Sequence, residues 1–262
     1  MKLIFKKLLA VSLLVTALLS LTSCFFTEEK LEYSDGDKYV SGPVRISGSS
    51  VIRGVNVSIS WLGGSVTVVP TDGDEIIVEE TNTSDLYYRN SLHTYYDGET
   101  FFIRPAESGT PLSQIPNGKY LTVHLPRALT VGALTVVSDA ADVSIGAVTV
   151  KGARVSIGSA SLVLKDTGIS DRFEYVSGSG DAVIEPAYLP SVTSISVTEG
   201  NTDLILPRTA AFTLKYRSPA GNLTSQYSEE LEGDTLTVGD GTSSVTYYSE
   251  RGNLYLGKQD QK

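Results

Sequence analysis

The sequence predicts an all-β fold, because a short motif recurs at intervals of about 20 residues between residues 134 and 256. Each copy follows a small or polar turn and consists of Asp, Ser or Asn and then two apolar residues that flank one other residue. The copies begin at Asp142, Ser161, Asp181, Asp203, Asn222 and Asn253. Such a period is typical of stacked units, each of which needs its neighbours to close a core.

A second strand is predicted upstream of each motif. Two apolar or aromatic residues, separated by one polar residue, lie eight and six positions before the start of each copy. These pairs are Leu134/Val136, Ala153/Val155, Phe173/Tyr175, Ile195/Val197, Leu214/Tyr216 and Val245/Tyr247. Alternation with a period of two indicates strands with one buried face. The near-constant unit length favours a parallel β-solenoid with rungs of about 20 residues, and the alternative is an antiparallel β-sandwich.

The part of the chain before the repeat is also rich in predicted strands. They cover Val51–Trp61, Ser65–Val69, Glu75–Glu80, Phe101–Arg104 and Tyr120–Leu125. One more strand, Thr235–Val238, lies in an insertion near the end of the repeat. No linker interrupts residues 44–257, so we expect one β-domain there, followed by a polar tail at residues 258–262.

Residues 1–23 are predicted to be a signal peptide. Three lysines precede the apolar segment Leu8 to Leu21, which is shorter than the length that a transmembrane helix usually needs. The sequence Leu21-Thr22-Ser23-Cys24 resembles the lipobox of bacterial lipoproteins. That resemblance implies cleavage before Cys24 and a lipid on its sulfur; the alternative is an ordinary secretory signal with an incidental cysteine.

A lipid-modified Cys24 would place the protein outside the cytoplasm, anchored to the bacterial membrane. Two or more acyl chains would make this attachment stable. Residues 24–43 are polar and acidic, and we expect them to form a flexible tether. Cleavage would remove three lysines and no acids, so the formal charge would change from −9 to −12. Such acidity argues against nucleic acid as a partner.

The corner sequences of the repeat resemble those of the bacterial DUF4097 group, often called putative adhesins. The resemblance rests on residues 176–184, residues 212–223 and Gly252-Asn253-Leu254. It implies an all-β, β-helix-like domain that is exported or attached to a membrane, and it brings no catalytic residues. The sequence departs from the pattern at Asp139-Ala140-Ala141, which lacks the corner glycine, and at Ser161.

Two acids of the repeat are candidate ligand-binding residues. Asp181 and Asp203 would be neighbours if their motifs stack, since adjacent strands lie about 4.8 Å apart. Close carboxylates can bind Ca²⁺ or act as acid and base on a glycan. The alternative is that each side chain caps a corner by accepting a backbone N–H. Ser and Asn at equivalent positions favour capping, so we expect no metal or other cofactor.

Four tyrosines form a second candidate site, because exposed aromatic rings can stack on sugars: Tyr87, Tyr88, Tyr95 and Tyr96. Adjacent strand residues face opposite sides, so one of each pair is expected in the core. A third candidate surface is an outward apolar stripe of Val163, Val183 and Ile205.

No catalytic constellation emerges from the sequence. His93 and His124 are the only histidines and Cys24 the only cysteine, which leaves no zinc cluster and no intramolecular disulfide. We therefore predict a non-enzymatic, adhesin-like binding protein or scaffold of the cell surface, with a glycan or a surface protein as its partner. The alternatives are a polysaccharide-active β-helix enzyme and an accessory protein of the envelope stress response.

Overall fold

The computed structural model describes residues 28–47, 54–82, 85–129 and 131–260, so the predicted signal peptide and Cys24 lie outside the described residues. The described part is all-β, with eighteen strands in one hydrogen-bonded sheet and three short 3₁₀ turns. None of these helical turns has the length or the apolar character that crossing a bilayer requires.

The elements follow one another as β1 Val40–Ser41, β2 Val44–Ser47, β3 Asn56–Thr71, β4 Glu75–Asn82, β5 His93–Tyr96, β6 Thr100–Arg104, β7 Lys119–Pro126, β8 Val131–Gly146, β9 Thr149–Ser159, β10 Leu162–Ser179, β11 Ala182–Tyr188, β12 Val192–Glu199, β13 Thr202–Leu206, β14 Phe212–Arg217, β15 Leu223–Ser225, β16 Thr235–Val238, β17 Ser243–Arg251 and β18 Leu254–Lys258. The 3₁₀ turns are η1 Gly36–Lys38, η2 Tyr88–Asn90 and η3 Leu112–Gln114.

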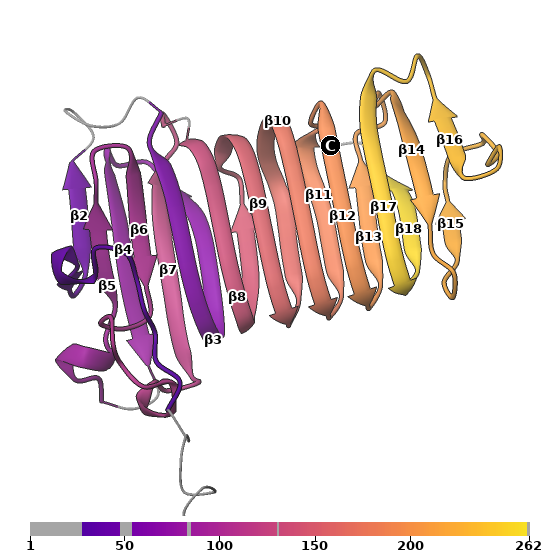
Figure 1. Ribbon diagram of the computed structural model, residues 1–262. Helices are drawn as coiled ribbons and strands as arrows, with labels where there is room; N and C mark the ends of the chain where they lie inside the picture. The colour runs from indigo at the N-terminus through magenta and orange to yellow at the C-terminus, as the bar shows by residue number, and fades with distance from the viewer. Residues whose placement is uncertain (1–27, 48–53, 83–84, 130, 261–262) are drawn as a thin grey trace, which may run out of the picture.

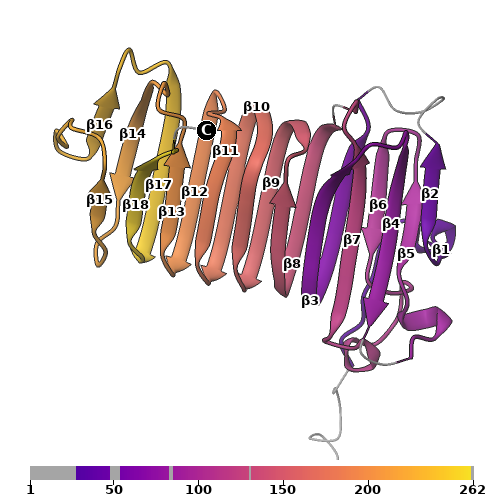
Figure 2. The ribbon, with the colours of Figure 1, turned by 180° about the vertical axis from the view of Figure 1, so that it is seen from behind.

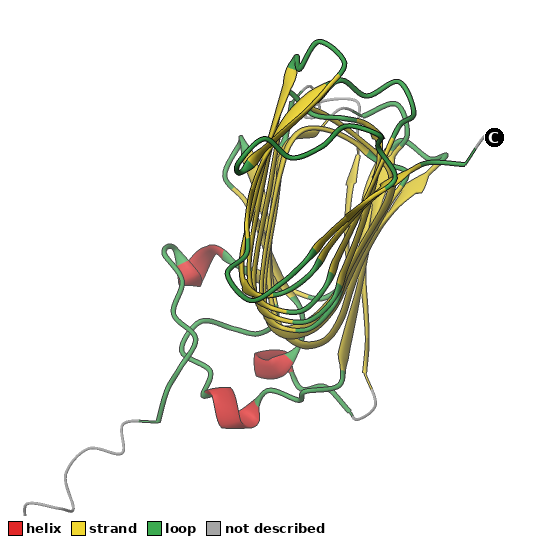
Figure 3. Cartoon of the chain, turned by 90° about the vertical axis from the view of Figure 1, so that its right-hand side faces the viewer, coloured by secondary structure: helices red, strands yellow, loops and turns green. Residues whose placement is uncertain are grey.

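The central strands pair in parallel with partners about 20 residues away, as the repeat predicts. Leu162 of β10 lies opposite Ala182 of β11, and Phe173 of the same strand lies opposite Ala153 of β9. Each repeat unit therefore contributes to two walls. Figure 3 shows these walls end-on as two layers that enclose an elongated interior, and Figure 1 and Figure 2 show their strands side by side.

We call these layers the first and second walls. The first wall contains β6, the first halves of β3 and β8, β9, the second half of β10, β12, β17 and β14. The second wall contains β4, β7, the second halves of β3 and β8, the first half of β10, β11, β13, β18 and β15.

One continuous apolar core fills the space between the walls. Buried and more exposed residues alternate along β11 and β13, which is the period-two pattern expected of strands with one buried face. Trp61, Phe101, Phe173, Tyr175 and Tyr247 are among the largest fully buried side chains. Complete burial of such apolar groups contributes about 1.5–3 kcal/mol each to the stability of the fold.

Glycine is required where the chain turns from the first wall to the second. Gly180 and Gly200 have φ angles of +124° and +119°. A Cβ atom on Gly180 would lie 2.1 Å from the carbonyl oxygen of Ala160, and one on Gly200 would lie equally close to the carbonyl oxygen of Gly180. The corners of successive units thus stack backbone on backbone, which explains their glycine-rich sequences.

Strand order departs from sequence order at both ends. The last unit is inserted between earlier ones, because β17 pairs with both β12 and β14, and β18 pairs with both β13 and β15. Likewise β3 lies between β8 and the β6–β7 unit. Antiparallel pairs occur at both ends of the sheet. At one end β16 pairs with β14, and at the other β4 pairs with β7 and β2 pairs with β4. Short antiparallel end strands limit edge-to-edge association.

Most of the predicted strands are present, and two segments differ from expectation. The predicted strands Val51–Trp61 and Ser65–Val69 belong to a single strand, β3, although residues 51–53 lie outside the described residues. Residues 28–43 are not a free tether. The N–H of Leu31 donates to the carbonyl of Thr110 and that of Gly42 to the carbonyl of Leu92, both at 3.0 Å.

The C-terminal boundary also shifts slightly. Lys258, predicted to begin the polar tail, is the last residue of β18, and its N–H donates to the side-chain oxygen of Gln226 at 2.8 Å. The N–H of Gln259 donates to the carbonyl of Leu206 at 2.9 Å. The packed domain thus includes at least residues 28–43 and 258–259 besides the predicted core.

Candidate functional site

The tyrosines of β5 face opposite sides of the sheet, as adjacent strand residues must. Tyr96 packs against the core, and its hydroxyl donates to the carbonyl of Gly98 at 2.7 Å. Tyr95 points outward, where it lies opposite Phe102 of β6. The two rings stack with centroids 6.1 Å apart and planes inclined by 12°. One member of this predicted pair is therefore available to a ligand.

Residues 32–39 fold over the outer face of β5 and β6 and complete an aromatic pocket. The ring of Tyr39 lies 5.5 Å from that of Tyr95 and 5.4 Å from that of Tyr33. A cavity of about 290 Å³ results, and its lining residues are Glu32, Tyr33, Ser34, Asp35, Tyr39, Tyr95, Asp97, Phe102 and Arg104. Aromatic faces and charged groups therefore share one small opening.

Two aromatic rings and a backbone carbonyl hold the Arg104 guanidinium in place in the aromatic pocket. The Arg104 guanidinium lies 5.6 Å from the ring centre of Tyr33 and 5.2 Å from that of Phe102. Its Nη1 donates to the carbonyl of Ser58 at 3.0 Å. Such cation–π contacts and hydrogen bonds fix a donor group at the wall of the pocket.

The polar groups of the pocket keep distinct protonation states. Burial raises the pKa of the Tyr33 and Tyr39 hydroxyls, against the opposing effect of Arg104. Backbone N–H groups of Thr100 and Glu99 lower the pKa of Asp97. The pocket therefore offers neutral phenols, the carboxylates of three acidic residues and a guanidinium, which together can stack on a ligand and hydrogen-bond to hydroxyl groups.

Tyr87 and Tyr88 lie elsewhere. They lie in and just before η2, with 75% and 61% of their surfaces exposed. The rings of Tyr88 and His93 form a T-shaped pair, with centroids 5.2 Å apart. The lining of the aromatic pocket includes neither residue. The structure thus divides the predicted four-tyrosine platform into one pocket residue, one core-facing residue and two exposed residues.

Asp181 and Asp203 are not neighbours in the pairing register. Asp203 lies opposite Val183, so Asn201 is the residue at the position next to Asp181. A carboxylate oxygen of Asp181 accepts the N–H of Asn201 at 2.8 Å. The outward row formed by Val163 and Val183 likewise continues into Asp203 rather than Ile205, so the predicted apolar stripe is not formed.

The same capping contact recurs along the corner. Asp142 accepts the N–H of Ser161 at 3.0 Å, and the side-chain oxygen of Asn253 accepts the N–H of Asn222 at 2.9 Å. Each side chain thus caps the backbone of the neighbouring unit. Within the ranges the structure covers, no three His, Cys, Asp or Glu side chains gather closely enough to hold a metal ion.

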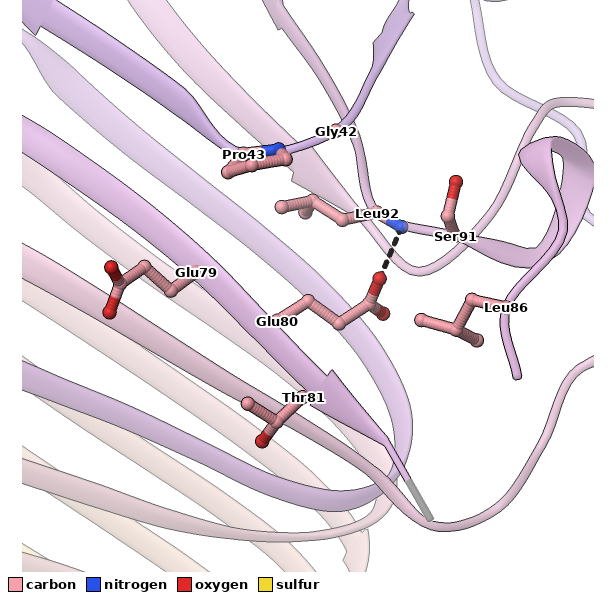
Figure 4. A pocket seen from close by; sticks show the side chains of 8 residues that line it. All are labelled: Gly42, Pro43, Glu79, Glu80, Thr81, Leu86, Ser91 and Leu92. Carbon is pink, nitrogen blue, oxygen red and sulfur yellow. Dashed lines mark hydrogen bonds between the residues drawn. The ribbon is translucent and has the colours of Figure 1, made fainter. Parts of the chain in front are cut away.

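A second cavity, of about 510 Å³, lies beside the end of β4 (Figure 4). Figure 4 shows the Glu80 side chain directed at the backbone N–H of Leu92, with which it forms a 2.7 Å hydrogen bond. Glu80 also forms a 2.7 Å ion pair with Lys119, and these side chains are only 6% and 1% exposed. The carboxylate in this cavity therefore already has structural partners.

Lys119 joins three segments at this end of the domain. Its ammonium group donates to the carbonyls of Asn90 and Pro105 and lies 5.3 Å from the ring centre of Trp61. Burial lowers the pKa of Lys119, and the contact with Glu80 opposes that shift. We conclude that this ion pair holds the N-terminal region together rather than binding a ligand.

Sequence reasoning missed most of the aromatic pocket. Tyr33 and Tyr39 belong to the segment expected to be a tether, which has no periodicity that would place it on the sheet. Phe102 and Arg104 alternate with the buried residues Phe101 and Ile103 in a strand that the sequence does predict. That alternation is the signal that could have placed them next to Tyr95.

No family model matches this chain, and no curated protein matches it significantly. Among solved structures, a putative cell adhesion protein from Clostridium sporogenes is similar with a TM-score of 0.55 and 9% identity, over 85% of this chain and all of that one. A putative adhesin from Bacteroides fragilis gives a TM-score of 0.35 and 11% identity, over 87% and 100% of the two chains. The first likeness shows that this chain shares the fold of that protein.

Proposed function

We propose that this protein is a lipoprotein of the bacterial cell surface that binds a saccharide through an adhesin-like domain of the DUF4097 type. A lipid on Cys24 would anchor it outside the cytoplasm, and the domain would be a parallel β-solenoid. The solenoid is supported by the parallel register of about 20 residues between successive units and by their shared core.

The aromatic pocket carries the proposal for the ligand. Stacked rings of Tyr95 and Phe102 present an apolar surface, while Asp97 and Arg104 provide an acceptor and a donor at its edge. Apolar faces rimmed by a few fixed polar groups are typical of small-ligand sites. A sugar ring combines an apolar face with hydroxyl groups at its edge, so its chemistry matches this arrangement.

The proposal is tested with a glycan array probed by the mature chain, residues 24–262. We expect binding to at least one glycan, and we expect Tyr95→Ala to weaken it about 5- to 30-fold, because stacking contributes about 1–2 kcal/mol. Tyr248→Ala is the matched control, since Tyr248 is an exposed tyrosine on β17, a strand at the opposite end of the domain.

Three outcomes would count against the proposal. Equal binding by the Tyr95→Ala and Tyr248→Ala variants would show that the aromatic pocket is not the glycan-binding site. A blank array would overturn the saccharide as ligand, and cleavage of a bound glycan, detected by product analysis, would overturn the non-enzymatic role. The anchor is tested separately by metabolic labelling with palmitate, which we expect wild-type protein to incorporate and Cys24→Ser to lose.

A further inference from the structure

The described chain begins very close to the cysteine proposed as the lipid anchor. Four residue steps separate Cys24 from Glu28, and they can span at most about 14 Å. Glu28 and Glu29 are already held by the domain. The N–H of Leu112 donates to the carbonyl of Glu29 at 2.9 Å, and the hydroxyl of Ser113 donates to the carboxylate of Glu28. An anchor at Cys24 would therefore hold this part of the domain next to the membrane.

The turn η2 lies beside this point of attachment. The side-chain amide of Asn90 in η2 donates to the carbonyl of Gln114 in η3 at 3.4 Å. The carbonyl of Arg89 accepts the N–H of Glu107 at 2.8 Å and the hydroxyl of Thr110 at 3.1 Å. Figure 3 shows the helical turns on the side of the molecule where the described chain begins. Contacts therefore connect η2 to the chain start through residues 107–114.

η2 presents two aromatic side chains on a fixed backbone. Tyr87 and Tyr88 are the most exposed aromatic residues in the described part of the chain. The N–H of Tyr87 donates to the side-chain oxygen of Asn90 at 2.7 Å, and the hydroxyl of Ser91 donates to the carbonyl of Tyr88 at 2.9 Å. Tyrosine is enriched at membrane–water interfaces, because its ring is apolar and its hydroxyl is polar.

We propose that Tyr87 and Tyr88 dock in the interfacial region of the membrane to which Cys24 anchors the protein. The inference rests on the proposed lipid anchor, which brings η2 to the lipid surface. Docking would orient the domain by a second contact and leave the far end, with β14 to β18, directed away from the lipid. A single attachment at Cys24 would not fix that orientation.

The charges near η2 specify the kind of lipid. Glu28, Glu29 and Asp85 add negative charge near the contact and outnumber the cation Lys30, while Arg89 is paired with Glu107 at 2.9 Å. An acidic surface is repelled by anionic headgroups, and the repulsion falls with added salt. We therefore expect docking through aromatic insertion into zwitterionic lipid rather than through electrostatic attraction.

The test couples the mature chain through Cys24 to a maleimide-bearing lipid in phosphatidylcholine vesicles. Two variants, Tyr87→Trp and Tyr188→Trp, place a fluorescent reporter at η2 and at a matched exposed tyrosine on β11. The native Trp61 is buried in the core and gives the same background in both variants. Fluorescence is then measured with and without lipids brominated on their acyl chains, and circular dichroism checks that both variants are folded.

We expect brominated lipid to quench most of the added indole fluorescence in Tyr87→Trp, and to leave the fluorescence of Tyr188→Trp unchanged. Including anionic lipid should reduce the quenching in Tyr87→Trp. Equal quenching in the two variants, or none in either, would overturn the docking proposal. Because the anchor is attached chemically, these results do not depend on lipidation in cells; absence of palmitate labelling at Cys24 would instead overturn the proposed anchor.

Discussion

The central units and the N-terminal end are built from the same kind of strand but differ in what they carry. From β8 to β13, units follow one another in sequence order and pair in parallel. At the N-terminal end, strand order changes, antiparallel pairs appear, and segments outside the sheet cover its outer face. The aromatic pocket and the buried Lys119–Glu80 pair both belong to this irregular end.

The repetition itself explains this division. An inward side chain in a central unit lies between equivalent residues of two neighbours about 4.8 Å away, so a charged group there would need a partner within the same stack. At the end of the stack, other segments can bring partners from different directions. Lys119 obtains one carboxylate and two carbonyls in that way. Regular units therefore form the scaffold, and irregular ones can accommodate specific polar groups.

The largest expected effect comes from breaking the buried pair of the irregular end. Lys119→Met leaves Glu80 buried without its cation, and we expect the free energy of unfolding to fall by about 3–5 kcal/mol. Arg127→Met is the control, because Arg127 pairs with Asp72 at 2.8 Å in solvent, where the loss should stay below about 1 kcal/mol. Urea denaturation measures both.

A further variant shows whether the loss arises from the unpaired charge. Adding Glu80→Leu to Lys119→Met removes the uncompensated carboxylate, so we expect part of the lost stability to return. Equal losses for Lys119→Met and Arg127→Met would mean that the buried pair contributes no more than a surface contact, and that the irregular end does not depend on it.

The next effect concerns the regular units. Gly180→Ala forces a Cβ atom to within 2.1 Å of the carbonyl oxygen of Ala160, at a φ angle of +124°. We expect a loss of about 2–3 kcal/mol in the free energy of unfolding, since the stacked corner cannot move away without breaking strand pairs. Gly146→Ala is the control, because a Cβ atom there meets nothing within 4 Å. Similar melting temperatures for the two variants would contradict the backbone stacking at the corner.

A smaller effect separates the two acids that the sequence groups together. Asp181→Ala removes the acceptor for the N–H of Asn201, so we expect a loss of about 1 kcal/mol. Asp203→Ala should have little effect, because Asp203 occupies an outward position opposite Val183. Ca²⁺ should leave the melting temperature of the wild type unchanged; a clear rise would restore the metal-binding alternative.

The sequence predicts the strands well because every unit must bury the same face. The register between units is less well determined. The motif alignment matches Asp203 with Asp181 and Ile195 with Phe173. In the structure, the residues beside Asp181 and Phe173 lie two positions earlier in the chain, at Asn201 and Thr193. A shift of two residues keeps every side chain on the same face of a strand, so the hydrophobic pattern cannot detect it. Asn is also a capping residue type, so both registers satisfy the corner pattern.

The irregular end could not be predicted in the same way. Burial of Lys119 depends on Glu80 and on two carbonyls from other segments, and no local pattern brings these groups together. Tyr33 reaches Arg104, and Tyr39 reaches Phe102, only because residues 28–43 fold back over β5 and β6. Local periodicity specifies the scaffold, whereas the pocket depends on contacts between segments far apart in the sequence.

The smallest expected effect tests how the aromatic pocket depends on the turn before β6. Asp97 accepts the N–H groups of Glu99 and Thr100 at 2.9 and 2.7 Å. These bonds lower the pKa of Asp97 from its usual 3.8, so its contribution is present above that pH and is lost as pH falls through the lowered value. We expect Asp97→Ala to lower the melting temperature slightly at pH 7, with a smaller difference from wild type in acid.

Asp74→Ala is the control, because Asp74 is an exposed residue of a different turn, between β3 and β4. If the two variants respond alike at every pH, the turn at Asp97 is not stabilised by its carboxylate. If only Asp97→Ala shows the pH-dependent difference and also weakens glycan binding at pH 7, the Asp97 carboxylate serves both the turn and the pocket. That result would tie the ligand site to the irregular end of the domain, where the Tyr95–Phe102 stack joins two antiparallel strands directly across this turn.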